Sequence, residues 1–276
     1  MKRAAYILAA ILVSLTVSAK KKESISKILK NPDTEYKYKC AQNYYNEGDY
    51  KKAIILYEAV QGSYRGTETA QEILYRLAYS YVKRKDYESA EHYLTNYLST
   101  YLRGDYVKEC NFMLAYCYYK ESPHYELDQT PTEKAVEQLR YCITLYPADE
   151  KTNDSRIMLE EMLDKLARRE LANATLYYNL GNYRGNNYRA AIVTSQNAMN
   201  DYPDCKYIED FAFIIVRSKY KEAVNSDAKK IYIRSEDAWD ECYYFLNEYP
   251  DTKHRKEVEK MSNHLEKINK SKLNKL

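Results

Sequence analysis

The chain has 276 residues, of which 45% are hydrophobic and 30% are charged, with only 6 Gly and 6 Pro. So few turn-forming residues argue against a β-sandwich of many short strands and favour an all-α fold. When Lys2 and Arg3 are left out of the count, the chain has 41 basic residues and 40 acidic residues. This balance argues against nucleic-acid binding, which requires a strong basic excess.

Tyrosine dominates the aromatic residues, with 33 Tyr against 4 Phe and 1 Trp. A buried phenol needs a hydrogen-bond partner for its hydroxyl, so these rings suit half-buried faces better than one deep core. An elongated fold, in which most residues lie near a surface, accommodates such an excess of tyrosine.

The N-terminus has the pattern of an export signal. Lys2 and Arg3 precede an apolar run over residues 4–17, which closes on the small residues 17–19. We predict a signal peptide at residues 1–19, cleaved after Ala19. The alternative is an uncleaved anchor, although 14 residues fall short of the roughly 20 that span a bilayer. The mature chain should therefore be exported, and soluble or peripherally attached, with a linker at residues 20–34.

Two segments, residues 36–57 and 75–94, align without gaps at a spacing of 37 residues. In each, a small residue is followed by a Tyr three positions later and by an Ala twelve positions later: Ala41, Tyr44 and Ala53, then Ala78, Tyr81 and Ala90. The pattern predicts a helix, a tight turn and a second helix. Small residues permit a close helix crossing, and the neighbouring Tyr and Leu side chains fill the grooves beside it.

Weaker copies of this unit follow along the chain. A third unit has Ala115 and Ala135, a fourth has Ala174 and Ala191, and a fifth ends near Ala238. Several units end in Tyr-Pro, where proline stops a helix. About five helix pairs should therefore form a solenoid over residues 35–252, followed by a basic and solvated tail at residues 253–276.

These units resemble the tetratricopeptide repeat, which implies an all-α, right-handed superhelical solenoid whose first helices line a concave face. The peptide-binding positions that the resemblance implies are Tyr38, Gln42, Tyr45, Tyr75, Tyr79, Lys83, Phe112 and Tyr116. An aromatic-lined groove with polar edges suits an extended peptide, because rings cover apolar side chains while polar groups bond to the main chain. Alternatively, rings occur on any face of a chain this rich in Tyr.

An insertion at residues 120–130 separates the two helices of the third unit. It contains Ser122, Pro123, Leu127, Asp128 and Gln129. With the Tyr-Pro endings and the five-unit layout, this segment is similar to the BamD family, the tetratricopeptide lipoproteins of the outer-membrane β-barrel assembly machinery, particularly its forms in Bacteroidetes. From residues alone, the segment breaks helical continuity and caps the helix that opens near Thr130.

The resemblance implies a non-enzymatic adaptor at the periplasmic face of the outer membrane, with peripheral membrane association. Its implied partners are a BamA-type barrel subunit and unfolded outer-membrane proteins with an aromatic-ended C-terminal strand. One feature departs from the family, which carries a lipid on a Cys directly after the signal. Here residues 20–22 are Lys and no Cys precedes Cys40, so either the protein is held by its partners or its N-terminus differs from those relatives.

Sequence signatures of catalysis are missing, including Gly-x-Ser-x-Gly, the P-loop and His-Glu-x-x-His. We therefore expect no catalytic residue, no metal and no cofactor. Glu160, Glu161 and Asp164 fit a solvated helix face better than an acid–base pair. The six Cys residues permit disulfides in an oxidising compartment, but their long spacings and apolar surroundings favour buried thiols.

Two other functions remain as alternatives. One is a different envelope adaptor with tetratricopeptide repeats, for example one that tethers cell-wall enzymes. The other is a glycan-binding protein of the SusD type, which needs a longer chain with Trp platforms, whereas this chain has only Trp239.

Overall fold

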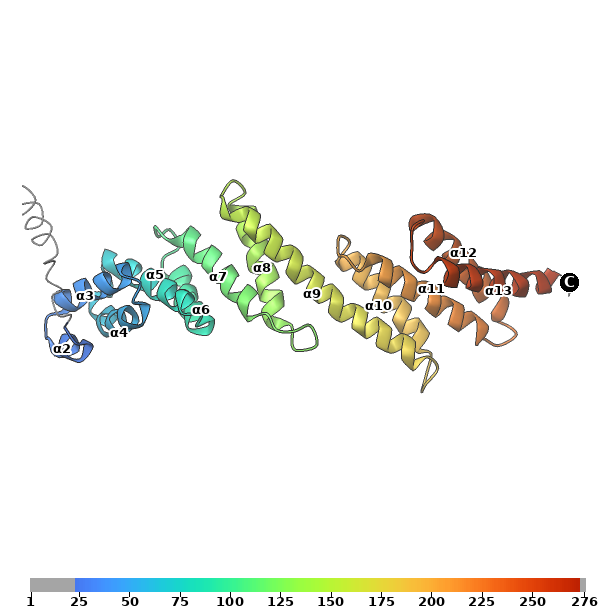
Figure 1. The fold of residues 1–276 in the computed structure, drawn as a ribbon, viewed down its shortest axis with the longest axis horizontal. Helices are drawn as coiled ribbons and strands as arrows, with labels where there is room; N and C mark the ends of the chain where they lie inside the picture. Colours follow the sequence, from blue (N-terminus) through green and yellow to red (C-terminus); the bar gives the residue numbers. More distant parts are fainter. Residues whose placement is uncertain (1–22, 274–276) are drawn as a thin grey trace, which may run out of the picture. The chain divides into compact units, whose positions relative to one another are not determined.

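The computed structural model describes residues 23–273 of the chain. Within that range, twelve α-helices and one short 3-10 helix are the only regular elements (Figure 1), which confirms the all-α prediction. The predicted signal peptide and the lysines at positions 20–22 lie outside the described residues.

The chain divides into two compact units, Met1–Cys110 and Asn111–Leu276, and α7 (Val107–Glu121) runs across their boundary. The other elements of the first unit are α2 (Ile25–Lys30), α3 (Thr34–Asn46), α4 (Tyr50–Val60), η1 (Gln61–Tyr64), α5 (Glu68–Lys83) and α6 (Tyr87–Thr100). Those of the second unit are α8 (Thr130–Leu145), α9 (Lys151–Leu180), α10 (Asn187–Asp201), α11 (Ile208–Val224), α12 (Ile231–Glu248) and α13 (Arg255–Leu273).

Each helix packs mainly against its neighbours along the chain. In the first unit α3 packs on α4 and α5 on α6, and in the second unit successive helices from α8 to α13 are in contact. Packing between sequence neighbours is the organisation of a helical solenoid. The five predicted pairs are α3–α4, α5–α6, α7–α8, α9–α10 and α11–α12.

Alanines lie where the paired helices cross. Ala41, Ala53, Ala78 and Ala90 have no exposed surface, and their repeat equivalents Ala135, Ala174, Ala191 and Ala238 in the second unit are equally buried. Larger side chains pack around these alanines, including Tyr44, Leu56 and Tyr57 in the first unit. The small residues thus have the steric role that the repeat pattern predicts.

The turns between paired helices repeat as well. Asp49 caps α4 and Asp86 caps α6, each accepting a hydrogen bond from a backbone N–H of the first turn. The residue before each Asp has a left-handed backbone, Gly48 with φ of 79° and Lys85 with φ of 62°. A side chain at such a position is strained, so the second turn keeps the conformation of the first at some cost in stability.

The C-terminal segment differs from its prediction. The expectation of a solvated tail is wrong for Arg255–Leu273, which form α13. Val258, Met261 and Leu265 lie on one face of α13 and are buried in a cluster with Phe213 and Phe245. The apolar spacing of three and four residues is helical, but the many lysines around it suggested a solvated segment. Within the predicted linker, Ile28 of α2 is also buried.

All six cysteines are free thiols, as favoured by the sequence. Burial raises the pKa of the Cys110, Cys142 and Cys242 thiols to about 12. These three groups therefore stay protonated and unreactive at neutral pH.

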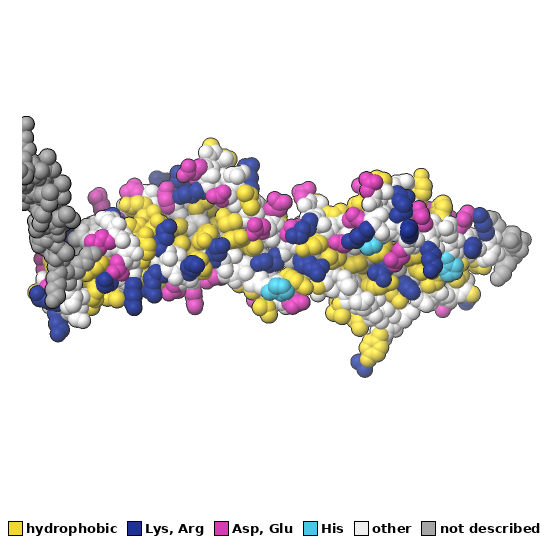
Figure 2. Space-filling view, viewed as in Figure 1, with side chains coloured by type: hydrophobic (Ala, Val, Ile, Leu, Met, Phe, Trp, Pro, Cys, Tyr) yellow, Lys and Arg dark blue, Asp and Glu magenta, His cyan; other side chains and the backbone are white. Residues whose placement is uncertain are grey.

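Basic and acidic side chains are intermingled in each unit on the face shown in Figure 2, in keeping with the near balance of charge. Among the helices within residues 23–273, none combines the length and the apolar composition that crossing a bilayer requires.

Gly48 provides a test of the turn geometry. A Cβ at Gly48 would meet no atom within 4 Å, so Gly48→Ala adds only the strain of the left-handed backbone. We expect it to lower the free energy of unfolding by about 1–2 kcal/mol, measured by urea denaturation. The control is Gly62→Ala, because Gly62 is equally open and its φ is not left-handed. Equal stability of the two variants would contradict this account.

Candidate functional site

The sequence-predicted groove residues of the first unit lie on α3 and α5. We call these six residues the tyrosine face: Tyr38, Gln42, Tyr45, Tyr75, Tyr79 and Lys83. All are half-buried except Lys83, which is exposed. The Tyr45 and Tyr79 ring centroids are 5.6 Å apart and those of Tyr75 and Tyr79 are 6.2 Å apart, so the two helices present one continuous set of rings.

A hydrogen-bonded chain fixes the α3 end of this face. The Gln42 amide donates to the Tyr38 hydroxyl at 2.8 Å, and that hydroxyl donates to the Glu72 carboxylate of α5 at 2.8 Å. The two helices are therefore joined by polar contacts as well as by ring contacts.

Arg76 lies among the rings and was not predicted as part of the site. Its guanidinium lies over the Tyr45 ring at 4.9 Å from the centroid, donates to the Tyr57 hydroxyl at 3.2 Å and pairs with Glu72. Tyr57 is fully buried beneath the face, with its ring 6.3 Å from Tyr38 and 6.4 Å from Tyr45. These contacts fix the positions of the rings before any ligand binds.

Tyr75 also contacts a ring outside the tyrosine face. It stacks on Tyr106 with 4.2 Å between centroids and 12° between planes. The pKa of both Tyr57 and Tyr75 is raised to about 12, mainly because the two phenols are buried. Both phenols are therefore neutral hydrogen-bonding groups near neutral pH.

The two remaining groove predictions belong to the second unit. Phe112 is only 7% exposed and packs in the core against Tyr146, with 5.5 Å between ring centroids, so it offers little surface to a ligand. Tyr116 is half-buried beside Tyr119, and Lys120 lies over both rings at 5.2 and 4.8 Å.

The predicted insertion forms an ordered loop at residues 122–129, between the end of α7 and the start of α8. Gln129 organises it from a fully buried position. Its amide donates to the carbonyls of His124 and Leu127 at 2.8 and 3.0 Å, and it accepts from the Thr132 hydroxyl at 2.8 Å.

The other family-like residues of the loop have separate contacts. The Ser122 hydroxyl lies 2.6 Å from that of Thr132 and accepts from the Lys165 ammonium at 2.6 Å. Asp128 accepts from the hydroxyl and the backbone N–H of Thr130, which supports the start of α8. Leu127 is 62% exposed, whereas Pro123 is half-buried.

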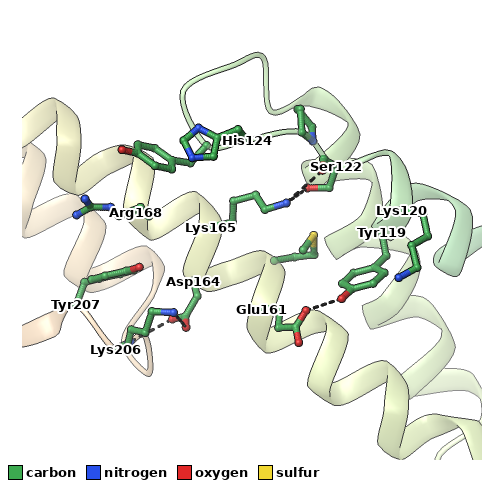
Figure 3. A pocket seen from close by; sticks show the side chains of 13 residues that line it. Tyr119, Lys120, Ser122, His124, Glu161, Asp164, Lys165, Arg168, Lys206 and Tyr207 are labelled. Carbon is green, nitrogen blue, oxygen red and sulfur yellow. Dashed lines mark hydrogen bonds and ion pairs between the residues drawn. The ribbon is translucent and has the colours of Figure 1, made fainter.

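The loop borders a cleft of about 590 Å³ within the second unit (Figure 3). We call it the loop cleft. Its walls come from the end of α7, the loop itself, the middle of α9 and the connection between α10 and α11. Glu161 and Asp164 line this cleft. The sequence predicted a solvated helix face for both, but Glu161 accepts a hydrogen bond from Tyr119 and Asp164 accepts one from Lys206. Their partners lie about 42 residues away in the chain, so local sequence could not reveal them.

No cluster of three or more His, Cys, Asp or Glu side chains with the geometry of a metal site occurs among residues 23–273. The fold and its surfaces define the chain as an all-helical repeat protein with preformed aromatic and charged faces. The chain belongs to the outer membrane lipoprotein family YfiO, whose model matches residues 30–231.

Two solved structures match the chain at low similarity. The TPR2AB-domain:pHSP90-complex of yeast Sti1 is 12% identical, with 84% of this chain and 98% of that chain covered at a TM-score of 0.37. The apo form of RapI is 14% identical, with 97% of this chain and 91% of that chain covered at a TM-score of 0.31. Values this low assign no function. A search of curated proteins finds no match.

Gln129 provides a test of the loop. Gln129→Ala removes three hydrogen bonds and leaves a buried gap, so we expect the free energy of unfolding to fall by about 2–4 kcal/mol in urea denaturation. Hydrogen exchange at residues 124–129 should also accelerate.

The matched control is Glu126→Ala, because Glu126 is an exposed residue of the same loop. It should change stability by less than about 0.5 kcal/mol. Unchanged exchange in the Gln129 variant would show that this side chain does not hold the loop.

Proposed function

We propose that the protein is a non-enzymatic periplasmic adaptor for the assembly of outer-membrane proteins, of the BamD type. It binds a BamA-type barrel-forming subunit and unfolded outer-membrane proteins. Membership of the outer membrane lipoprotein family and the all-helical repeat fold support this role.

The tyrosine face carries the substrate-binding part of the proposal. An unfolded outer-membrane protein presents extended backbone on which apolar side chains, some of them aromatic, alternate with polar ones. Half-buried rings on α3 and α5 can cover such side chains, while Gln42 and Lys83 bring polar groups to the same face. Rings held by Arg76 and Glu72 need little reordering on binding, which lowers the entropic cost of association.

Contact with the outer membrane is peripheral in this proposal. The family consists of outer membrane lipoproteins, and no helix within residues 23–273 could cross the bilayer. Docking on a barrel-forming subunit would hold the adaptor next to its substrates.

Partner identity tests the role directly. A tagged protein is recovered from gently solubilised native envelopes, and its partners are identified by mass spectrometry. We expect a stoichiometric barrel protein with periplasmic repeats. Recovery of cell-wall enzymes without such a barrel would instead support a different envelope adaptor and contradict the assembly role.

The tyrosine face is tested with a fluorescent peptide that ends in an aromatic residue, like the C-terminal strand of a barrel protein. The double variant Tyr75→Ala, Tyr79→Ala should retain its helicity in circular dichroism and lose about tenfold in affinity, which corresponds to ~1.4 kcal/mol. Because Tyr75 also stacks on Tyr106, the single variant Tyr79→Ala tests ligand contact while that stack stays in place.

The control is Tyr183→Ala, because Tyr183 is 62% exposed and lies in the second unit. It should bind the peptide as the wild type does. Unaltered affinity in both tyrosine-face variants would exclude this face as the peptide site.

A further inference from the structure

One face of α9 carries four charged residues toward the loop cleft (Figure 3). Glu161, Asp164, Lys165 and Arg168 are spaced by three and four residues, the spacing that places side chains on one side of a helix. Their contacts with the surrounding elements decide which charges remain available to a ligand.

Both carboxylates of this face are already engaged. The Tyr119 hydroxyl of α7 donates to Glu161 at 2.6 Å. The Lys206 ammonium lies 3.1 Å from the Asp164 carboxylate, which also accepts from the Lys206 backbone N–H at 3.1 Å. The carboxylates therefore secure the walls of the cleft.

Among residues 23–273, the hydrogen-bond acceptors of the Lys165 ammonium are uncharged. Its ammonium donates to the hydroxyl and the carbonyl of Ser122, at 2.6 and 3.3 Å. Burial lowers the pKa of Lys165, and the Glu161 carboxylate acts in the opposite direction without cancelling this effect. The hydrogen bonds fix this cation at the edge of the loop without neutralising it.

Arg168 contacts aromatic rings rather than hydrogen-bond acceptors. Its guanidinium lies over the rings of Tyr125 and Tyr207, at 5.3 and 5.7 Å from their centroids. No hydrogen bond or ion pair joins it to another residue in the described range 23–273. Ring faces stabilise the cation but accept none of its N–H groups in the guanidinium plane, so a planar donor fork remains for a ligand.

The chemistry of the cleft indicates what it binds. The guanidinium fork matches a carboxylate in two parallel hydrogen bonds, and Lys165 lies one helical turn away. Lys120 also lines the cleft, where it lies over the Tyr116 and Tyr119 rings, so a third cation is present and the cleft suits several carboxylates better than one. Tyr119, Tyr125 and Tyr207 offer ring surface to intervening apolar side chains.

A phosphate-rich surface fits this cleft less well. Such a surface presents charge without neighbouring apolar side chains, which the rings of Tyr119, Tyr125 and Tyr207 could cover in a peptide. The volume of about 590 Å³ is within the usual range for ligand sites.

We propose that the loop cleft binds an acidic peptide segment of a partner protein, in which Arg168 and Lys165 receive side-chain carboxylates and the tyrosine rings cover neighbouring side chains. This site is built entirely within the second unit and does not depend on the assembly role proposed above.

The test uses the full chain and the fluorescent peptide acetyl-Glu-Leu-Glu-Tyr-Glu-amide, with binding followed by anisotropy. We expect saturable binding that weakens with added salt, and at least about tenfold weaker binding of the peptide with Gln in place of Glu. Equal binding of the two peptides would overturn the proposal. The proposal would also be overturned if the Gln peptide with a free C-terminal carboxylate bound and the Glu peptide amide did not.

Arg168→Gln should weaken binding of the Glu peptide by about tenfold or more without changing the circular dichroism spectrum. The control is Arg156→Gln, the same substitution at an exposed position of α9, which should bind within about twofold of the wild type. Wild-type affinity in the Arg168 variant would refute the site. If phosphatidylglycerol vesicles bind through Arg168 while the peptide does not, the cleft is a lipid site and the proposal is wrong.

Discussion

The close crossing of paired helices over alanine is the constraint on which the other features depend. Ala53 and Ala90 have no exposed surface because a neighbouring helix lies directly against them. Residues of one pair also contact the next pair: Tyr38 of α3 donates to Glu72 of α5, and Arg76 of α5 donates to Tyr57 of α4. A larger residue at the crossing would separate the helices of one pair and displace the side chains that contact the next pair.

The excess of tyrosine follows from this architecture. In a stack of helix pairs, many rings lie partly in the core and partly at a face, where a phenol can bury its ring and still bond through its hydroxyl. Tyr97 is fully buried and donates to Gln71 at 3.2 Å, whereas Tyr119 donates from the rim of the loop cleft to Glu161. Phenylalanine would pack as well at such positions but could not join neighbouring elements through a directed hydrogen bond.

Periodic features of the chain were predictable from the sequence, and contacts between distant segments were not. The 37-residue spacing located the alanine crossings, and the polar insertion marked the loop before Thr130, because both depend on local steric and turn preferences. The burial of Phe112 was missed, since groove and core positions differ by a small rotation about the helix axis. Arg168 was missed because its two rings come from elements on either side of it in the chain.

The free thiols bear on how the chain folds in an oxidising compartment. In the periplasm, where we propose that the protein works, disulfides form readily, and an unfolded chain exposes all six cysteines. After folding, burial leaves thiols such as Cys142 and Cys242 protonated and shielded from oxidants. Each of these two is covered by helices adjacent in sequence, and such local contacts form quickly. Packing between neighbouring helices thus shortens the time in which incorrect disulfides can form. The protection of each cysteine from oxidation therefore depends on when the helices around it fold.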